Sequence, residues 1–259
     1  MKIALVSYIN TRPFMDGLSA AFSPQEVQLD LRPPAECARV LAEGQCDMAL
    51  IPVGALDQFS DIRLLPDYCI GASGSVESVY IFSQQPIETL DTLYLDRHSR
   101  SSNGLARILL RHHWGIAPEI RMPAEKNVSL IHGHTGGVVI GDYAIRVREQ
   151  FAYRYDLAEA WQALTGLPFA FAVWAYHPDR VDPRMLTPLQ TAMGVGVDNA
   201  LKSASRWADF YKIPRDYALH YLTNCIDFRF DAPKHQALEL YLGALRSLTE
   251  VNYATLPPF

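Results

Sequence analysis

Short apolar runs alternate with helix-like segments along the first third of the chain. Runs at Ile3–Val6, Val27–Leu31 and Asp47–Val53 predict three strands. Between them, Pro13–Phe22 and Pro34–Glu43 predict two helices, the first with a proline suited to its opening turn. A β-α-β-α-β order is typical of a doubly wound sheet, because each helix returns the chain to begin another parallel strand. We therefore expect an α/β fold.

This alternation begins again after about residue 84, and the chain closes with mostly helical sequence. Further strands are predicted at Ser78–Ser83, Thr92–Leu95, Ile120–Met122, Gly137–Gly141 and Phe169–Trp174, and helices at Asn103–His113 and Asp156–Leu164. The restart predicts two lobes, one formed by residues 1–84 with 176–259 and the other by residues 85–175. Two crossings between lobes suit hinge closure around a ligand.

Charge and hydropathy exclude several classes of protein. The 259 residues carry a formal net charge of −5, spread without long runs, so the basic face of a nucleic-acid-binding protein is not expected. No stretch is apolar for long enough to cross a bilayer. The apolar run at the N-terminus is too short for a secretory signal. We expect a cytoplasmic protein without nucleic-acid or membrane partners.

The cysteines and histidines give no sign of a metal site. The cysteines are Cys37, Cys46, Cys69 and Cys225, and they form no CxxC pair. Buried thiols in a reducing compartment are expected. His132 and His134 lie in a glycine-rich loop without an obvious third ligand, so metal binding is not expected there. Phosphate-binding loops, complete dinucleotide-binding motifs and nucleophile elbows are also missing.

Polar loops follow several predicted strands. In open parallel sheets, ligands bind beyond the carboxyl ends of the strands. The loops at such ends are Ser7–Arg12, Val53–Gly54, Gly71–Ser78, Asp96–Ser102 and Gly141–Asp142. Their common placement, more than any one of them, predicts a binding site.

Each loop has two interpretations. The serines before Asn103 could bind an anion at a helix start or only cap the helix, and spacing favours the cap. Asn10 could cap a helix or point its amide into a cleft, and the sequence favours neither interpretation over the other. Gly74 and Ser75 could offer backbone amides to a carboxylate or form a flexible connection. Asp142 could be an acid, a base or a helix cap.

Five pieces of the sequence, in this order and spacing, resemble the menaquinone-pathway family of chorismate dehydratases. They are VSYINTRP (Val6–Pro13), GSVESVYIFS (Gly74–Ser83), LDRHSRSS (Leu95–Ser102), IGDYAI (Ile140–Ile145) and YDLAEAWQALTGLPFAFAVW (Tyr155–Trp174). The last two are the most diagnostic. The resemblance implies an α/β, two-lobed fold like that of type II periplasmic solute-binding proteins, with two mixed, mainly parallel sheets and a ligand cleft between the lobes.

The resemblance also implies an enzyme of the futalosine route to menaquinone. Members of the family convert chorismate into 3-[(1-carboxyvinyl)oxy]benzoate and water without a metal or an organic cofactor. No cofactor is therefore expected, and the expected partner is the small-molecule substrate, chorismate. The sequence leaves open whether the chain is a monomer or a homodimer.

Residues of the matching pieces become candidates for the site. Asn10 matches a cleft asparagine that handles substrate in the family, and Asp142 is a lesser candidate for a catalytic acid or base. Substrate-binding residues are expected to be Tyr8, Thr11, Arg12, Gly74, Ser75, Val76, Ser78, Ser99, Arg100, Ser101 and Ser102. The proton acceptor could also be the substrate's own enolpyruvyl carboxylate, which lies within reach of the departing hydrogen.

Three positions depart from the family, and at two of them Ser73 and Ser75 replace residues more usual there. Glu77 stands where the family often has a basic residue. A glutamate beside a dianionic substrate is unfavourable unless it points away or pairs with an arginine. Direct contact between position 77 and a substrate carboxylate is therefore in doubt.

Two other functions remain open. A related enzyme of the same pathway makes 1,4-dihydroxy-6-naphthoate with a cleft histidine as base, and His132 or His134 would be the only stand-ins here. A solute-binding protein without chemistry would bind its ligand and release it unchanged. Such a protein would be expected to carry a secretory signal.

Overall fold

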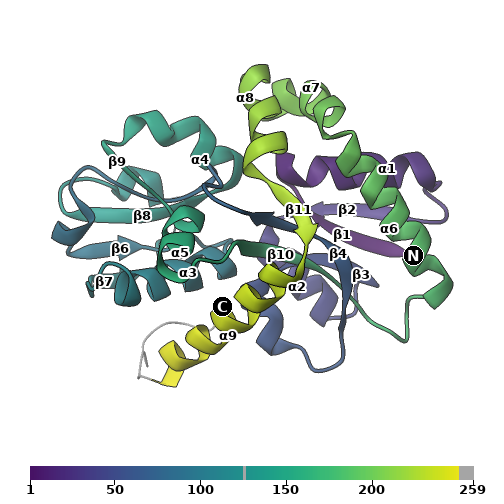
Figure 1. Cartoon of the computed structure of the whole chain (residues 1–259), viewed down its shortest axis with the longest axis horizontal. Helices are drawn as coiled ribbons and strands as arrows, with labels where there is room; N and C mark the ends of the chain where they lie inside the picture. Colours follow the sequence, from purple (N-terminus) through teal and green to yellow (C-terminus); the bar gives the residue numbers. More distant parts are fainter. Residues whose placement is uncertain (125–126, 251–259) are drawn as a thin grey trace.

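The computed structural model describes residues 1–124 and 127–250, which build two sheets lying beside each other (Figure 1). In spatial order the first sheet contains β11 (Asp227–Phe230), β4 (Arg63–Ala72), β10 (Phe169–Tyr176), β3 (Met48–Pro52), β1 (Lys2–Val6) and β2 (Gln28–Arg32). The second contains β7 (Glu119–Arg121), β6 (Thr92–Tyr94), β8 (Thr135–Ile140), β5 (Val79–Ser83) and β9 (Tyr153–Asp156). Each sheet, with the helices packed on it, is called a lobe below.

Most helices belong to the first lobe. They are α1 (Arg12–Ala21), α2 (Pro34–Ala42), α6 (Pro183–Asp198), α7 (Ala200–Tyr211), α8 (Arg215–His220), the π-helix η6 (Tyr221–Cys225) and α9 (Ala232–Glu250). The second lobe has α3 (Arg100–His112), α4 (Gly141–Val147) and α5 (Leu157–Thr165). Short 3₁₀ turns are η1 (Ile9–Thr11), η2 (Val53–Gln58), η3 (Ile87–Thr89), η4 (Asn127–Leu130) and η5 (Arg148–Gln150). Helix α9 reaches across and packs on α3 of the second lobe (Figure 1).

The sheets are mixed, as predicted, but parallel pairs do not dominate. The pairs β1–β2, β1–β3, β6–β7 and β6–β8 are parallel, whereas β10 and β5 are antiparallel to both of their neighbours and β11 is antiparallel to β4. The reason is the route of the chain. Strands β1 and β3 run toward the second lobe, and β10 returns from it, so β10 must run against β3.

The chain changes sheet earlier than the predicted boundaries. The prediction placed residues 1–84 in the first lobe and 85–175 in the second. Strand β5, which ends at Ser83, nevertheless belongs to the second sheet, and β10, which begins at Phe169, belongs to the first. Both strands are buried along their whole length. A fully buried apolar run shows no alternation, so its sequence does not reveal which sheet it joins. Strands β4, β9 and β11 were not predicted, and Gly71 lies inside β4 instead of a loop.

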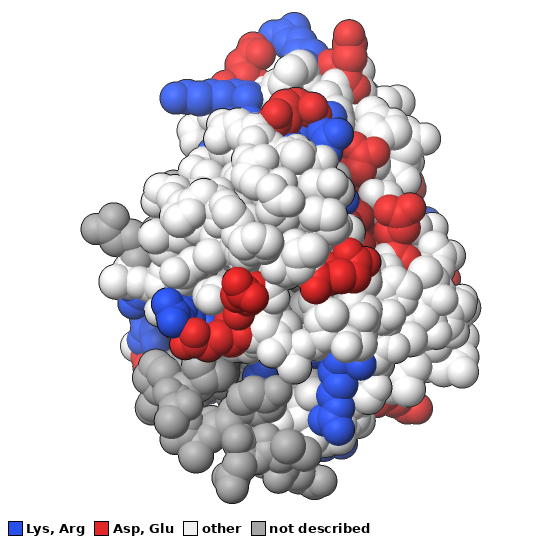
Figure 2. Space-filling model, turned by 90° about the vertical axis from the view of Figure 1, so that its left-hand side faces the viewer, with Lys and Arg blue, Asp and Glu red and all other residues white. Residues whose placement is uncertain are grey.

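Charged side chains of both signs are mixed on one face of the molecule (Figure 2). On the face of the second lobe, acidic and basic side chains are interspersed among broad uncharged areas, and no continuous basic patch is seen among the described residues there (Figure 2). No helix in residues 1–124 or 127–250 has the length and apolar character needed to span a bilayer.

Helices α1 and α6 pack backbone against backbone at two glycines. A Cβ atom added at Gly17 would collide with the carbonyl oxygen of Ala192, and one added at Gly196 would collide with that of Pro13. Neither backbone oxygen can turn aside as a flexible side chain could. This close approach fixes α1, whose N-terminal end follows the loop that carries Asn10.

Gly196→Ala should therefore lower the free energy of unfolding by about 3 kcal/mol, the upper end of typical overpacking costs. The matched control is Gly243→Ala in α9, where an added Cβ meets nothing within 4 Å. The control should raise stability by about 0.5–1 kcal/mol, because alanine favours helix more than glycine. Urea unfolding of both variants measures the difference, and equal effects would contradict the packing account.

Candidate functional site

A cavity of about 520 Å³, part of it open to solvent, lies between the two lobes. Its lining residues are Val6, Tyr8, Asn10, Pro34, Pro52, Ile70, Val76, Ser78, Val79, Ser99, Ser101, Ser102, Ile140, Gly141, Phe171 and Ala172. The strands β1, β3 and β10 contribute from the first lobe, and β5, β8 and α3 from the second. Polar residues from loops of both lobes thus meet at one cavity.

The walls combine apolar surface with uncharged polar groups. The polar lining side chains are those of Tyr8, Asn10, Ser78, Ser99, Ser101 and Ser102. Neither lysine nor arginine is present among the described residues that line the cavity. An anion in this cavity would therefore be held by hydroxyls, amide groups and the N-terminal end of a helix.

The N-terminus of α3 supplies one group of donors. Ser99 is the N-cap, as the spacing favoured, and its hydroxyl accepts the backbone N–H of Ser102 at 3.2 Å. The Ser101 hydroxyl donates to the carbonyl of Phe171 at 2.7 Å and so ties α3 to β10. The Ser102 hydroxyl bonds to no other described residue and faces the cavity. The positive end of the helix dipole and this hydroxyl together favour an anion.

A hydrogen-bond relay crosses the cavity wall from one lobe to the other. The Asn10 amide donates to the Tyr221 hydroxyl at 3.1 Å, and Tyr221 donates to the Ser78 hydroxyl at 2.8 Å. Burial raises the pKa of Tyr221, so the phenol keeps its proton. Because Tyr221 supplies the proton between the two oxygens, the proton of Ser78 is available to a ligand. We call this arrangement the relay.

Tyr221 is a site residue that the sequence did not reveal. It is fully buried in η6, and 211 positions separate it from Asn10. An aromatic residue in a helical stretch is usually part of the core, and no motif surrounds it.

The loop before Ser78 is held by a buried carboxylate. Asp156 accepts the Ser75 hydroxyl and the Glu77 backbone N–H, both at 2.8 Å, and also caps α5. Burial raises the pKa of Asp156, and these hydrogen bonds oppose the rise. Val76 and Ser78 line the cavity, whereas Gly74 and Ser75 do not. The predicted flexible connection is thus an ordered one that aims Ser78.

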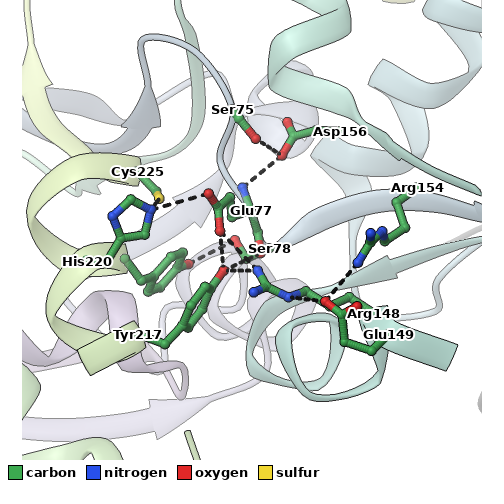
Figure 3. Close-up of polar contacts among 11 residues, drawn as sticks. Ser75, Glu77, Ser78, Arg148, Glu149, Arg154, Asp156, Tyr217, His220 and Cys225 are labelled. Carbon is green, nitrogen blue, oxygen red and sulfur yellow. Dashed lines mark hydrogen bonds and ion pairs between the residues drawn. The ribbon is translucent and has the colours of Figure 1, made fainter. Parts of the chain in front are cut away.

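Glu77 points away from the cavity and pairs with an arginine. This is the arrangement in which a glutamate at this position does not repel a dianionic substrate. The Glu77 carboxylate binds Arg148 at 3.0 Å and accepts the Tyr217 hydroxyl at 2.6 Å (Figure 3). Burial raises the pKa of Glu77, but the hydrogen bonds from Tyr217, His220 and Arg148 outweigh burial and lower it. Glu77 therefore stays ionised without facing a ligand.

Besides Gly74 and Ser75, three more predicted binding residues, Thr11, Arg12 and Arg100, do not line the cavity. Thr11 donates its hydroxyl to the Asn10 side-chain oxygen at 3.3 Å and so orients that amide. Arg12 is buried, with its guanidinium 4.2 Å above the Trp207 ring and bonded to the Tyr211 hydroxyl. The guanidinium of Arg100 binds the Gln58 side chain. Thr11 therefore acts on the site through Asn10, and both arginines are engaged elsewhere.

Asp142 lies at a second opening on the far side of Tyr8. Its carboxylate accepts the backbone N–H of Ile9 at 3.1 Å and thereby fixes the turn that carries Asn10. Burial raises the pKa of Asp142 to about 7, although the Ile9 hydrogen bond and Arg146 lower it. Gly141, at φ +65°, leaves room for the Tyr8 ring, which an added Cβ would meet at 2.8 Å. Asp142 is thus well placed to position the turn.

The two loop histidines lie elsewhere. His132 and His134 are exposed, and His134 bonds to the carbonyl of Thr89 at 2.9 Å. Neither lines the cavity between the lobes. The described structure therefore offers no cavity histidine as a base.

A family model described as menaquinone biosynthesis matches residues 1–247. The chain belongs to this menaquinone-biosynthesis family. A curated relative from Thermus thermophilus, named chorismate dehydratase, is 27% identical over 231 residues, which is 82% of this chain and 84% of the relative.

Solved structures show the fold. A protein from Archaeoglobus fulgidus matches with a TM-score of 0.77 at 11% identity, covering 96% of this chain and 98% of that one. A Candida albicans protein, described as having the generic periplasmic-binding-protein fold, matches with a TM-score of 0.68 at 10% identity, covering 98% and 90%. This member of the menaquinone-biosynthesis family therefore has the two-lobed binding-protein fold that its sequence resembles.

The raised pKa of Asp142 predicts a pH dependence of stability. Between 3.8 and about 7 the folded protein holds a proton at Asp142 that the unfolded chain releases. This stabilising contribution is complete below pH 3.8 and is lost as the pH rises through about 7. Asp142→Asn keeps the acceptor for Ile9 but cannot titrate. Across that window, wild-type stability should fall relative to the variant, by on the order of 4 kcal/mol.

Denaturant unfolding at several pH values measures this difference. Asp198→Asn, at an exposed position, is the control and should run parallel to wild type. Parallel curves for wild type and Asp142→Asn would contradict the assignment.

Proposed function

We propose that this chain is a chorismate dehydratase, a lyase that removes water from chorismate to give 3-[(1-carboxyvinyl)oxy]benzoate. The observation that carries the proposal is the cavity in which Asn10, Ser78 and the Ser99–Ser102 turn come together from both lobes. Membership of the menaquinone-biosynthesis family and the relative named chorismate dehydratase support it.

The cavity suits a small dianion with an apolar ring. The N-terminus of α3, with the free Ser102 hydroxyl, would hold one carboxylate. Ser78, with its own proton freed by Tyr221, would donate to the second carboxylate or to the ring hydroxyl. Side chains such as Val6, Ile70 and Phe171 would cover the ring and exclude water.

The reaction needs little beyond orientation. A C–H bond at the ether carbon and the neighbouring C–O bond break, a ring double bond forms, and the proton and hydroxide leave as water. Aromatisation makes the overall change favourable. The substrate's own enolpyruvyl carboxylate would accept the proton, since the described lining residues include no carboxylate. Asp142 would act as a positioning residue through Ile9.

Incubation of the purified protein with chorismate, followed by mass analysis of the products, tests the proposal. Loss of one water and appearance of the aromatic product are expected. Tight binding with chorismate recovered unchanged would instead indicate a solute-binding protein. Conversion only of a cyclic futalosine derivative would indicate the related naphthoate-forming enzyme.

Ser78→Ala should lower kcat/KM for chorismate by roughly 10²-fold, as loss of one oriented donor does in other enzymes. Ser83→Ala is the matched control, because Ser83 is buried at the other end of β5 and donates to the Gln85 carbonyl instead. The control should keep wild-type turnover per folded molecule. Equal losses in both variants would remove Ser78 from the site.

A further inference from the structure

A second cluster of reactive side chains lies behind the cavity wall. Glu77, His220 and Cys225 each offer one ligand atom, and these atoms lie within 4.8 Å of one another (Figure 3). None of the three lines the cavity between the lobes. The cluster is therefore separate from the proposed substrate site.

The π-helix brings two of these residues together. In η6 the Ile226 N–H donates to the Tyr221 carbonyl at 3.0 Å, five residues back. His220 and Cys225 are also five apart, and an α-helix would turn their side chains about 140° away from each other. The wider turn places both on one side. Helical turns of this kind are rare and often occur at functional sites.

Glu77 reaches the pair from the loop that leads into the second lobe. Its φ of +53° is in the left-handed region, which a residue with a side chain seldom adopts. The loop is held in that conformation by Asp156, which accepts the Glu77 N–H. The fixed backbone thus places Glu77 beside His220.

Two of the three ligand-to-ligand distances match the edges of a tetrahedral metal site, and the third lies within 4.8 Å. Nε2 of His220 lies 3.3 Å from Oε1 of Glu77 and 3.3 Å from Sγ of Cys225. Usual zinc bond lengths give ligand-to-ligand edges of about 3.3–3.6 Å. Without an ion, the Nε2–H of His220 and the thiol of Cys225 would both donate to the Glu77 carboxylate. A cation would satisfy all three atoms together.

The second oxygen of Glu77 is already held. Oε2 accepts the Tyr217 hydroxyl at 2.6 Å and the Arg148 guanidinium at 3.0 Å, which leaves Oε1 for the cluster. Hydrogen bonds of this type orient ligating carboxylates in metal proteins.

We propose that Glu77, His220 and Cys225 bind one divalent cation of the zinc class, with water as the fourth ligand. Thiolate, imidazole and carboxylate ligands together favour zinc over magnesium or calcium. The His220 side chain is 49% exposed, which gives solvent and the ion access. The proposal depends on this ligand geometry and not on the proposed reaction.

The position of the site suggests its effect. Glu77 precedes Ser78, and His220 precedes Tyr221, so the ligands are the chain neighbours of two relay members. A bound ion would join the loop into the second lobe to the π-helix of the first. It would hold the Tyr221 and Ser78 hydroxyls at their hydrogen-bond distance and act as a structural clip between the lobes.

Titration of the tag-free, chelator-treated protein with Co²⁺ tests the site, because cobalt reports a thiolate ligand through a charge-transfer absorption band. Wild type should bind one equivalent with this band, and Zn²⁺ should displace it. Cys225→Ala and His220→Asn should lose the band. Tyr217→Phe should keep it with affinity weakened about 10–100-fold, the usual effect of removing a group that orients a ligand.

Two variants serve as matched controls. Cys46→Ala removes a buried thiol outside the cluster, and His112→Asn removes an exposed imidazole at the end of α3. Both should bind Co²⁺ as wild type does. The proposal is overturned if wild type shows no thiolate band, or if the band persists in Cys225→Ala or His220→Asn. Should Cys225→Ala fail to fold, the half-exposed His220 still decides the question.

Discussion

Two hydrogen bonds in series, from Asn10 through Tyr221 to Ser78, are the constraint on which the site depends. They join the turn of the first lobe that carries Asn10 to Ser78, which directly precedes β5 of the second lobe. The phenol of Tyr221, which connects the two, is fully buried. Their direction matters as much as their presence. With the Tyr221 proton committed, Ser78 must donate outward, and the cavity gains an oriented donor without a cationic side chain.

The ends of the relay are fixed by buried carboxylates. Asp142 holds the turn that carries Asn10, and Asp156 holds the loop that carries Ser78. Each accepts a backbone N–H from a segment far away in sequence. The two carboxylates therefore fix the loops, and hydroxyl groups on those loops are left to bind the ligand. Because the charged groups hold the loops and do not face the ligand, the cavity wall is neutral although the expected ligand is a dianion. A fixed array of dipoles can bind an anion without an opposite charge beside it.

The sequence predicted the architecture well where periodicity and topology constrain it. The opening β-α-β-α-β order, the two lobes and the placement of polar loops at strand ends follow from the sequence pattern, and the family motifs added the likeness to periplasmic solute-binding proteins. The sheet to which β5 and β10 each belong could not be predicted, because fully buried strands show no alternation of apolar and polar residues. Arg12 illustrates a further limit. Its place in a family motif predicted contact with the substrate. The aromatic rings that enclose it instead come from α7, nearly 200 residues away. Tyr221 depends on a π-turn that no local signal announces.

A double-mutant cycle on kcat/KM for chorismate, combining Ser78→Ala with Tyr221→Phe, tests the relay most directly. If Tyr221 acts only by directing the Ser78 proton, Tyr221→Phe should lower activity in the wild-type background and have no further effect once Ser78 is alanine. Independent losses that multiply in the double variant would show that the two hydroxyls do not work as one unit, and the account of the site would be wrong.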